Sequence, residues 1–363
     1  MTDMATAVVQ TAPETYELRE LPLPEIGFDD ALLELEACGI CGTDVEVFEG
    51  GPNRSYPIVP GHEPLGRIIR IGDGASAKWA VKEGDRVAVH STLTCGRCRT
   101  CRAGLRGCTA PEFSDSAIYG FRSPDVSPGL WGGFATHLYL APEAMVLPVS
   151  LDLSVGAASL FNVMSNGVDW AIELGGVRAG MSVAILGPGP RGLATLIACK
   201  AAGAGPIAVT GLTRDGERLA MARELGADAT LDVSGGNVAG AVVDALGRAP
   251  QLVIDTTPGS VDSVVDAIAM VAQKGMIVLA GLKGPGRTAP VPVDQIAAKQ
   301  VTIRGVVSRA LSSMQYAIEL IESQRWPFDR LASDAFGLAD AEQAVRSLMG
   351  DHPPLHARIE IGA

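Results

Sequence analysis

The sequence predicts an α/β protein with two domains, one rich in β-strands and one in which strands and helices alternate. Its 363 residues exceed the length of one ordinary domain. The first 150 residues contain short strand-like runs, whereas the region after them alternates apolar and amphipathic segments. We expect residues 1–163 and 306–363 to form one domain and residues 164–305 the other.

Short runs rich in β-branched and other apolar residues fill the first region. Glycine and proline interrupt them roughly every ten residues, a pattern typical of an irregular β domain or barrel. The clearest of these runs are ALLELEA at 31–37, LGRIIRIG at 65–72, DRVAVH at 85–90 and ATHLYLA at 135–141.

Strand-like apolar runs alternate with amphipathic helical segments in the second region. Continuous apolar strands alternating with helices predict a parallel sheet covered on both faces, that is, a doubly wound fold. The strands are expected in SVAILG at 182–187, PIAVTG at 206–211, LVIDTT at 252–257 and MIVLAGL at 276–282. A helix follows from about Ser308, and HARIEIGA at 356–363 predicts a strand that returns to the first domain.

Composition and charge limit the classes of function. Hydrophobic residues make up 47% of the chain, and the formal net charge is −12. An acidic chain is a poor nucleic-acid ligand because phosphate binding needs a basic surface. The sequence contains no signal-like start and no apolar run near the ~20 residues of a membrane span. We therefore expect a cytoplasmic protein with no membrane or nucleic-acid partner.

A glycine motif follows the first strand of the second region. VAILGPGPRG places Gly187, Gly189 and Gly192 in GxGxxG spacing between an apolar strand and a helix, with Arg191 inside the motif. In this context the glycines allow a tight turn, close approach of a pyrophosphate, and packing of helix on strand. The motif predicts a dinucleotide site; the alternative is a glycine-rich turn in an ordinary α/β domain.

The end of the next strand bears on which dinucleotide binds. NAD-selective folds usually place an acid there, but this chain has Gly211, followed by Thr213 and Arg214, with Arg218 one turn later. An arginine can pair with the 2′-phosphate of NADP. The pattern therefore favours NADP over NAD, unless Asp215 takes the ribose-binding role.

Four cysteines lie close together in CGRCRTCRAGLRGC. Cys95, Cys98, Cys101 and Cys108 have the spacing of a closed, tetrahedral structural zinc site. An iron–sulfur cluster is the main rival, since cysteines at two-residue gaps also suit one. A zinc ribbon that contacts nucleic acid is opposed by the acidic charge. Disulfides between cysteines three residues apart would be geometrically awkward.

Another pair of cysteines opens a second cluster of ligand-type residues. Cys38 and Cys41 in ACGICGTDVEVFEG have CxxC spacing, which on its own allows a redox pair, a metal site or two unrelated cysteines. His62 and Glu63 follow in PGHEPLG. One thiolate, one imidazole and one carboxylate form a mixed set typical of a catalytic zinc with an open position.

The motifs GICGTD, GHE, the four-cysteine segment, GGFATH and GxGxxG occur in one order along the whole chain. That order resembles the zinc-dependent medium-chain alcohol dehydrogenases. The resemblance implies a GroES-like catalytic domain and a Rossmann dinucleotide-binding domain. It implies that Cys41, His62 and Glu63 serve the catalytic zinc, while Cys38 is buried packing. It also implies that Thr43 contacts the substrate oxygen and passes its proton outward, with Asp44 positioning the metal site.

Three departures from the family pattern stand out. Many members carry a histidine in a proton relay where this chain has Glu46, which is either a substitute relay or a solvated acid. Where members place a Cys or Glu ligand, this chain has Asn162, so Glu63 or water completes the coordination, or zinc is bound weakly or lost. The last cysteine of the four, Cys108, comes after six residues rather than seven, which still allows a tetrahedral site.

The resemblance implies hydride transfer between an alcohol and NAD(P), with zinc polarising the substrate oxygen. A secondary alcohol, polyol or sugar is the expected small-molecule substrate, and a dimer or tetramer the expected assembly. Two alternatives remain at this point. One is a zinc-free quinone or enone reductase of the same superfamily; the other is a dinucleotide-binding protein without catalytic activity.

Overall fold

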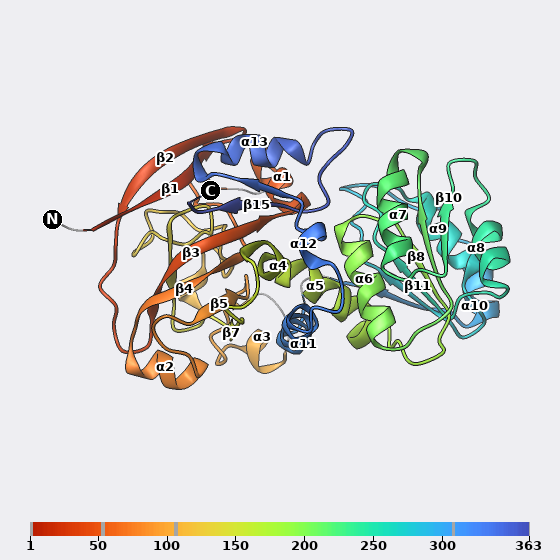
Figure 1. Ribbon diagram of the computed structural model, residues 1–363, viewed down its shortest axis with the longest axis horizontal. Helices are drawn as coiled ribbons and strands as arrows, with labels where there is room; N and C mark the ends of the chain where they lie inside the picture. The colour runs from red at the N-terminus through yellow and green to blue at the C-terminus, as the bar shows by residue number, and fades with distance from the viewer. Residues whose placement is uncertain (1–2, 52–54, 105–107, 307–308, 363) are drawn as a thin grey trace. The chain divides into compact units, whose positions relative to one another are not determined.

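The computed structural model describes residues 3–51, 55–104, 108–306 and 309–362. The chain forms two compact units, each drawn with its elements labelled in Figure 1. The first unit comprises Met1–Asn162 and Ile321–Ala363, and the second comprises Val163–Leu320. Each unit has its own sheet and its own candidate binding residues.

The first unit is built mainly from β-strands. They are β1 (Met4–Ala12), β2 (Thr15–Pro22), β3 (Ala31–Ile40), β4 (Pro64–Ile71), β5 (Arg86–Val89), β6 (His137–Leu140), β7 (Val146–Pro148), β14 (Asp334–Phe336) and β15 (Ala357–Glu360). Short helices connect them: α1 (Gly42–Phe48), α2 (Asp73–Trp79), α3 (Arg99–Arg102), α4 (Val155–Ser159), α12 (Phe328–Leu331) and α13 (Ala341–Ser347).

In the described part of this unit, one sheet has the strand order β14-β15-β3-β4-β5-β7, and β6 also pairs with β3. β1 and β2 form a separate antiparallel ribbon. β15 pairs antiparallel with β3, with Ile359 opposite Cys38, which confirms the strand expected to return to the first domain. The sheet therefore joins residues from both ends of the described chain around β3.

The second unit contains a six-stranded parallel sheet in the order β10-β9-β8-β11-β12-β13. Its strands are β8 (Val183–Leu186), β9 (Ile207–Gly211), β10 (Ala229–Asp232), β11 (Leu252–Asp255), β12 (Met276–Leu279) and β13 (Thr302–Gly305). Its helices are α6 (Pro190–Ala201), α7 (Gly216–Glu224), α8 (Val238–Leu246), α9 (Asp262–Met270) and α10 (Val293–Lys299). The strand order reverses between β8 and β11, so the predicted doubly wound sheet is confirmed.

Two helices span the points along the chain at which one unit ends and the other begins. α5 (Phe161–Val168) continues into a π-helical segment, Asp169–Leu174, and α11 (Leu311–Glu322) is the helix expected from about Ser308, a residue outside the described ranges. The side chain of Asp169 accepts hydrogen bonds from the Ala310 amide and the Ser313 hydroxyl, each at 2.9 Å. These bonds tie the start of α11 to the π-helical segment within the second compact unit, which ends at Leu320.

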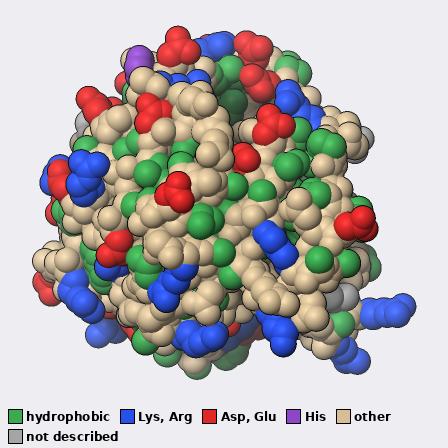
Figure 2. Space-filling view, turned by 90° about the vertical axis from the view of Figure 1, so that its right-hand side faces the viewer, with side chains coloured by type: hydrophobic (Ala, Val, Ile, Leu, Met, Phe, Trp, Pro, Cys, Tyr) green, Lys and Arg blue, Asp and Glu red, His purple; other side chains and the backbone are tan. Residues whose placement is uncertain are grey.

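Basic and acidic side chains are interspersed with hydrophobic ones on the face drawn in Figure 2. Among the described residues, no helix combines the length and the apolar character that crossing a bilayer requires.

An arginine on β5 anchors the chain between the sheet and α4. Arg86 Nε lies 2.5 Å from Glu36 Oε2, and Arg86 Nη1 donates to the carbonyl oxygens of Ser150 (3.0 Å) and Leu153 (2.9 Å). Arg67 Nε donates to the same carboxylate at 2.7 Å. Burial alone would raise the pKa of Glu36, but the two arginines outweigh it and lower that pKa.

We expect Arg86→Met to lower the free energy of unfolding by about 3 kcal/mol, because it leaves buried acceptors without their partner. Arg67→Met is the matched control: it removes the other arginine from Glu36, but the Arg67 side chain is 44% exposed, against 4% for Arg86. Its expected cost is about 0.5 kcal/mol. Urea unfolding of both variants measures the difference, and equal losses would contradict the special role of Arg86.

Candidate metal centres and dinucleotide site

The turn from β3 into α1 fixes the thiol of Cys41. Cys41 is the N-cap of α1 in an extended backbone conformation, and its Sγ accepts a hydrogen bond from Thr43 N at 3.4 Å. Asp44 Oδ2 accepts one from Cys41 N at 2.8 Å. This reciprocal capping box satisfies amides that a helix start leaves unpaired. The thiol is thus held by the backbone rather than by a flexible loop.

Asp44 also orients the imidazole of His62. His62 Nδ1 lies 3.1 Å from Asp44 Oδ1, and His62 Nε2 lies 3.4 Å from Cys41 Sγ. In histidines that bind metals, a carboxylate commonly accepts a hydrogen bond from one ring nitrogen, and the other nitrogen binds the metal. The side chains of Cys41, His62 and Asp44 are all buried.

Glu63 completes a compact group of possible metal ligands. One ligand atom each from Cys41, His62 and Glu63 lies within 4.8 Å of the others. The Glu63 side chain is fully buried, and within the described ranges neither of its carboxylate oxygens has a hydrogen-bond partner. Burying an ionised carboxylate without such partners is costly. A divalent cation among these three ligands would compensate for that cost, so the residues present fit a metal ion.

The electrostatics of this group favour positive charge. Burial would lower the pKa of His62, but the negative charges of Asp44 and Cys41 outweigh it and raise that pKa well above its usual value. The same charges would attract a metal cation. Cys38 behaves differently: burial raises the pKa of its thiol, and the residue packs in a hydrophobic cluster with Ile40 and Phe134.

His356 is a neighbour of Glu63 that the sequence analysis did not single out. A Cβ on Gly39 would lie 2.5 Å from Glu63 Oε2 and 3.2 Å from His356 Nε2, so both groups face the same glycine. His356 is buried, and burial and Arg358 lower its pKa to about 3. Pairing of β15 with β3 brings it there, which no local sequence signal reveals.

The other residues expected at this site lie on α1 and α5. Thr43 is half-buried in the first turn of α1, and Glu46 is exposed one turn later. The Glu46 side chain makes no hydrogen bond within the ranges that the structure describes. Asn162 lies in the first turn of α5 and is buried; its amide oxygen has no partner among the described residues. Cys41, His62 and Glu63 form the converging set, and Asn162 contributes a separate buried oxygen.

The four remaining cysteines of interest converge around α3. One sulfur atom each from Cys95, Cys98, Cys101 and Cys108 lies within 4.8 Å of the others, and all four are free thiols. Amide N–H groups point at sulfur: Cys98 N donates to Cys95 Sγ at 3.3 Å, and Cys101 N donates to Cys98 Sγ at 3.4 Å. The shortened spacing before Cys108 therefore does not prevent convergence.

One of these thiols, that of Cys98, has a lowered pKa. The Thr100 hydroxyl, followed by the amides of Cys101 and Thr109, lowers the pKa of Cys98 to about 4. By contrast, burial and the neighbouring thiol of Cys98 raise the pKa of Cys101 to about 12. A cation shared by the four sulfurs would favour thiolate at every position, as in a structural zinc site.

The glycine motif in the second unit has the backbone of a phosphate-binding loop. Gly187 has φ +98°, and a Cβ on Gly192 would lie 2.0 Å from Gly187 O, so neither position tolerates a side chain. Gly189 caps the start of α6, and a Cβ there would meet nothing within 4 Å. Arg191 lies in the first turn of α6. The open space at this helix N-terminus fits a pyrophosphate.

The residues after β9 bear on the ribose end. Asp215 Oδ2 accepts a hydrogen bond from Leu212 N at 2.9 Å, and its Oδ1 lies 3.7 Å from Arg218 Nη1. Thr213 Oγ1 donates to Asp232 Oδ2 at 2.7 Å. Gly211 is buried beneath the glycine loop, since a Cβ there would lie 2.8 Å from Pro188 Cγ, whereas Arg214 is exposed.

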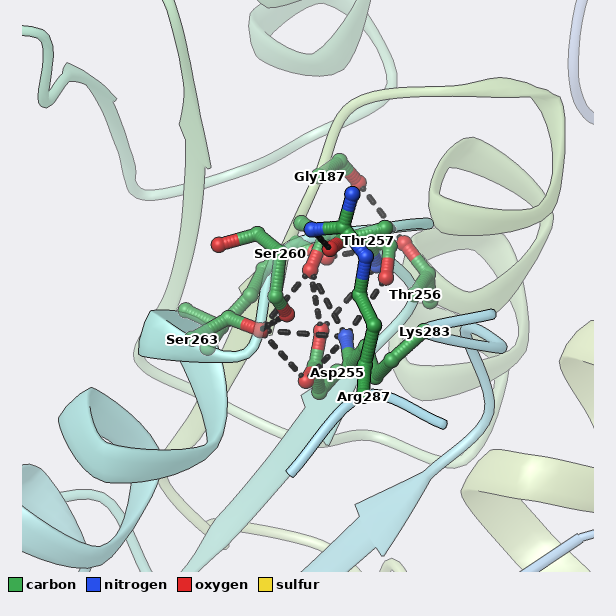
Figure 3. A network of polar contacts seen from close by, with 10 residues as sticks. Gly187, Asp255, Thr256, Thr257, Ser260, Ser263, Lys283 and Arg287 are labelled. Carbon is green, nitrogen blue, oxygen red and sulfur yellow. Dashed lines mark hydrogen bonds and ion pairs between the residues drawn. The ribbon is translucent and has the colours of Figure 1, made fainter. Parts of the chain in front are cut away.

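A polar group at the end of β11 was not predicted from the sequence. Thr256 Oγ1 lies 2.8 Å from Leu186 O and 3.1 Å from Gly187 O, which ties β11 to the glycine loop (Figure 3). Asp255 and Lys283 extend this group through an ion pair in which Lys283 Nζ lies 2.8 Å from Asp255 Oδ2. The polar DTT at the carboxyl end of an apolar strand is the signal that could have found it, because ligands bind at that edge of such sheets.

Comparison with known proteins agrees with both units. Residues 27–150 match the model of the alcohol dehydrogenase GroES-like domain, and residues 190–323 match that of the zinc-binding dehydrogenases. The chain is 40% identical over 356 residues to a protein described as a probable alcohol dehydrogenase from Mycobacterium tuberculosis, covering 96% of each chain. It is 30% identical over 348 residues to the sorbitol dehydrogenase of Macaca fascicularis, covering 94% of this chain and 92% of that one.

A solved structure described as a zinc-binding dehydrogenase from Sinorhizobium meliloti bound to NADP is similar over 99% of both chains, with a TM-score of 0.83 and 25% identity. The two matching family models, the long relatives and the two-unit fold agree with the motif order. The chain therefore belongs to the zinc-type medium-chain alcohol dehydrogenase family.

Proposed function

We propose that Cys41, His62 and Glu63 hold the catalytic zinc of this NAD(P)-dependent oxidoreductase of alcohols or polyols. The observation that carries the proposal is the convergence of these three buried residues, whose ligand atoms lie within 4.8 Å of one another. A zinc ion held there would polarise the substrate oxygen and lower the pKa of its hydroxyl. The zinc-free reductase is not favoured, because it has no use for this set of ligands.

Asn162 is proposed to face the same ion directly or through water. Its support is the buried amide oxygen that lacks a hydrogen-bond partner within the described ranges. An amide oxygen carries no charge, so it stabilises a cation less than the Cys or Glu of other family members does. The negative charge that neutralises the ion then comes from Cys41 and Glu63.

Thr43 is proposed to receive the substrate proton. It is half-buried, and it follows the ligand Cys41 by two residues on α1, whose start is fixed by the capping box. Its hydroxyl can accept a proton from the alcohol while donating its own outward. Glu46 is exposed one turn along the same helix and could take that proton to solvent; its exposure fits a solvated surface acid equally well.

The four-cysteine group around α3 is proposed as a structural zinc site. Four sulfurs without a free position suit a closed tetrahedral centre, and backbone amides already stabilise two of them. This group lies outside the catalytic set. We expect its role to be stability of the first unit, rather than chemistry on the substrate.

NADP is proposed as the preferred dinucleotide. Asp215 accepts a hydrogen bond from the Leu212 amide and lies 3.7 Å from Arg218, so part of its acceptor capacity is used within the turn after β9. Arg214 is exposed and follows the strand end at Gly211, where a 2′-phosphate would approach. The bound NADP in the Sinorhizobium meliloti protein supports the same preference.

A secondary alcohol, polyol or sugar is proposed as the substrate, supported by the sorbitol dehydrogenase relative. We also propose assembly into dimers or tetramers. The edge strand β13 supports this proposal because it is exposed along its length and pairs on one side with β12. The seven free cysteines support a reducing, cytoplasmic location.

We expect plasma mass spectrometry to find about two zinc ions per wild-type chain and about one in Cys41→Ala. Cys38→Ala is the matched control, since it removes the neighbouring buried thiol and should keep both ions. One zinc in wild type and in Cys41→Ala alike would mean that only the four-cysteine site is filled. The catalytic zinc would then be absent, and the dinucleotide-binding protein without activity would be favoured.

We expect Arg214→Ala to weaken NADPH binding roughly tenfold while NADH binding changes less than twofold, because a charge-assisted hydrogen bond to the 2′-phosphate is lost. Fluorescence titration with both cofactors gives the two dissociation constants. Arg178→Ala is the control, an exposed arginine in the segment before β8. A wild-type preference for NADH would instead assign the ribose contact to Asp215.

A further inference from the structure

A buried ion pair lies at the carboxyl end of β11, outside the residues assigned so far. Lys283 Nζ is 2.8 Å from Asp255 Oδ2, and the Asp255 side chain is fully buried while that of Lys283 is 15% exposed. Lys283 belongs to the segment that follows β12, whereas Asp255 is the last residue of β11. The pair therefore joins two segments at the same edge of the sheet (Figure 3).

The same ammonium has further acceptors close by. Lys283 Nζ lies 2.6 Å from Thr257 O, 3.1 Å from Thr257 Oγ1 and 3.0 Å from Ser263 Oγ. Ser263 Oγ in turn donates to Asp255 Oδ2 at 2.8 Å. An ammonium has only three N–H groups, so these contacts use its full capacity. Lys283 is held in place by β11, by the loop after it and by the first turn of α9.

The segment after β12 is pressed against the loop after β11 at other points as well. A Cβ on Gly281 would lie 2.2 Å from Thr257 O, so only glycine permits this approach. Arg287 Nη1 donates to Gly259 O at 3.0 Å, and Gly259 N donates to Leu282 O at 3.0 Å. Lys283 lies between these contacts and is largely buried, whereas Arg287 is exposed.

This junction borders the glycine loop. A Cβ on Gly187 would lie 3.0 Å from Thr256 Oγ1 and 3.1 Å from Thr257 Cγ2, so the two threonines shape the loop from the β11 side. A doubly wound sheet binds its dinucleotide across the point where strand order reverses, here between β8 and β11. The residues after β9 are those expected to contact the adenosine ribose, so the adenosine half lies on the β9 side of β8. The nicotinamide half then falls on the side of β11 and β12.

We propose that Lys283 is a positioning residue for the nicotinamide half of the dinucleotide. Its ammonium holds the segment after β12 against the end of β11 and so sets the shape of the sheet edge that the nicotinamide half contacts. This inference rests on the proposed dinucleotide binding at Gly187–Gly192. It differs from a purely structural role, because a general stabiliser would affect both halves of the cofactor alike.

The test compares a whole dinucleotide with its adenosine fragment. Lys283→Met should raise the dissociation constant for NADPH about tenfold or more, with a change of less than twofold for adenosine 2′,5′-bisphosphate. Fluorescence titration and calorimetry on the full-length protein measure the two constants without turnover. NADH and AMP serve as the equivalent pair if wild type prefers NAD.

Lys299→Met is a matched control. Its ammonium also bonds backbone carbonyls in the same unit, those of Ile268, Ala269 and Val271, but at the carboxyl end of α9 rather than at its start. We expect this variant to bind NADPH and the bisphosphate as wild type does. Equal weakening of both probes in Lys283→Met, or the same loss in Lys299→Met, would overturn the proposal.

Removing Lys283 alone leaves Asp255 as a buried charge without its partner, which can unfold the unit. The double variant Asp255→Asn/Lys283→Met removes both charges and keeps an acceptor for the Ser263 hydroxyl. If the single variant does not fold, the same two titrations on the double variant test the proposal. Selective loss of NADPH binding supports the proposal, and unchanged binding overturns it. Wild type that binds neither NADPH nor NADH would contradict the dinucleotide function itself, a separate result.

Discussion

The proposed catalytic group of the first unit depends on the carboxylate of Asp44. One of its oxygens accepts a hydrogen bond from the Cys41 amide and completes the capping box of α1. The other oxygen lies within hydrogen-bond distance of His62 Nδ1. A single side chain thereby sets the position of a thiol and the direction of an imidazole that lie on different segments. Its negative charge also raises the local attraction for a cation. Loss of this carboxylate would disturb both proposed ligands, Cys41 and His62, together.

Local patterns were enough to predict much of the fold. Glycine-punctuated runs predicted the strands of the first unit, and apolar runs alternating with helices predicted the parallel sheet, both confirmed. The family models and relatives confirm the class of enzyme. The hydrogen bonds of Asp169 to the start of α11 join residues more than 140 positions apart, a contact that local sequence patterns do not reveal.

The parts of the sites that the sequence did not reveal depend on distant pairings. His356 lies beside Gly39, near Glu63, because β15 pairs with β3, and a lone histidine carries no ligand spacing in the sequence. Lys283 and Asp255 meet because parallel strands end at one edge, although each residue alone reads as an ordinary surface or turn charge. The four cysteines and the glycine motif could be recognised because their members lie within short segments of the sequence, and the roles proposed for them stay predictions. The roles of Asn162 and Glu46 stay predictions.

The pairing of β15 with β3 also affects how the enzyme is made. Cys41, His62 and Glu63 leave the ribosome early, but the strand that lies beside Cys38 and Gly39 is translated after the entire dinucleotide unit. Until then residues Ala37–Ile40 of β3 lack their β15 partner, although Ala31–Glu34 can already pair with β6, and His356 is absent from the surroundings of Gly39. A nascent chain that already carries the proposed ligands Cys41, His62 and Glu63 therefore still lacks the strand beside Cys38 and Gly39, and completion of the proposed metal site depends on the later synthesis of β15.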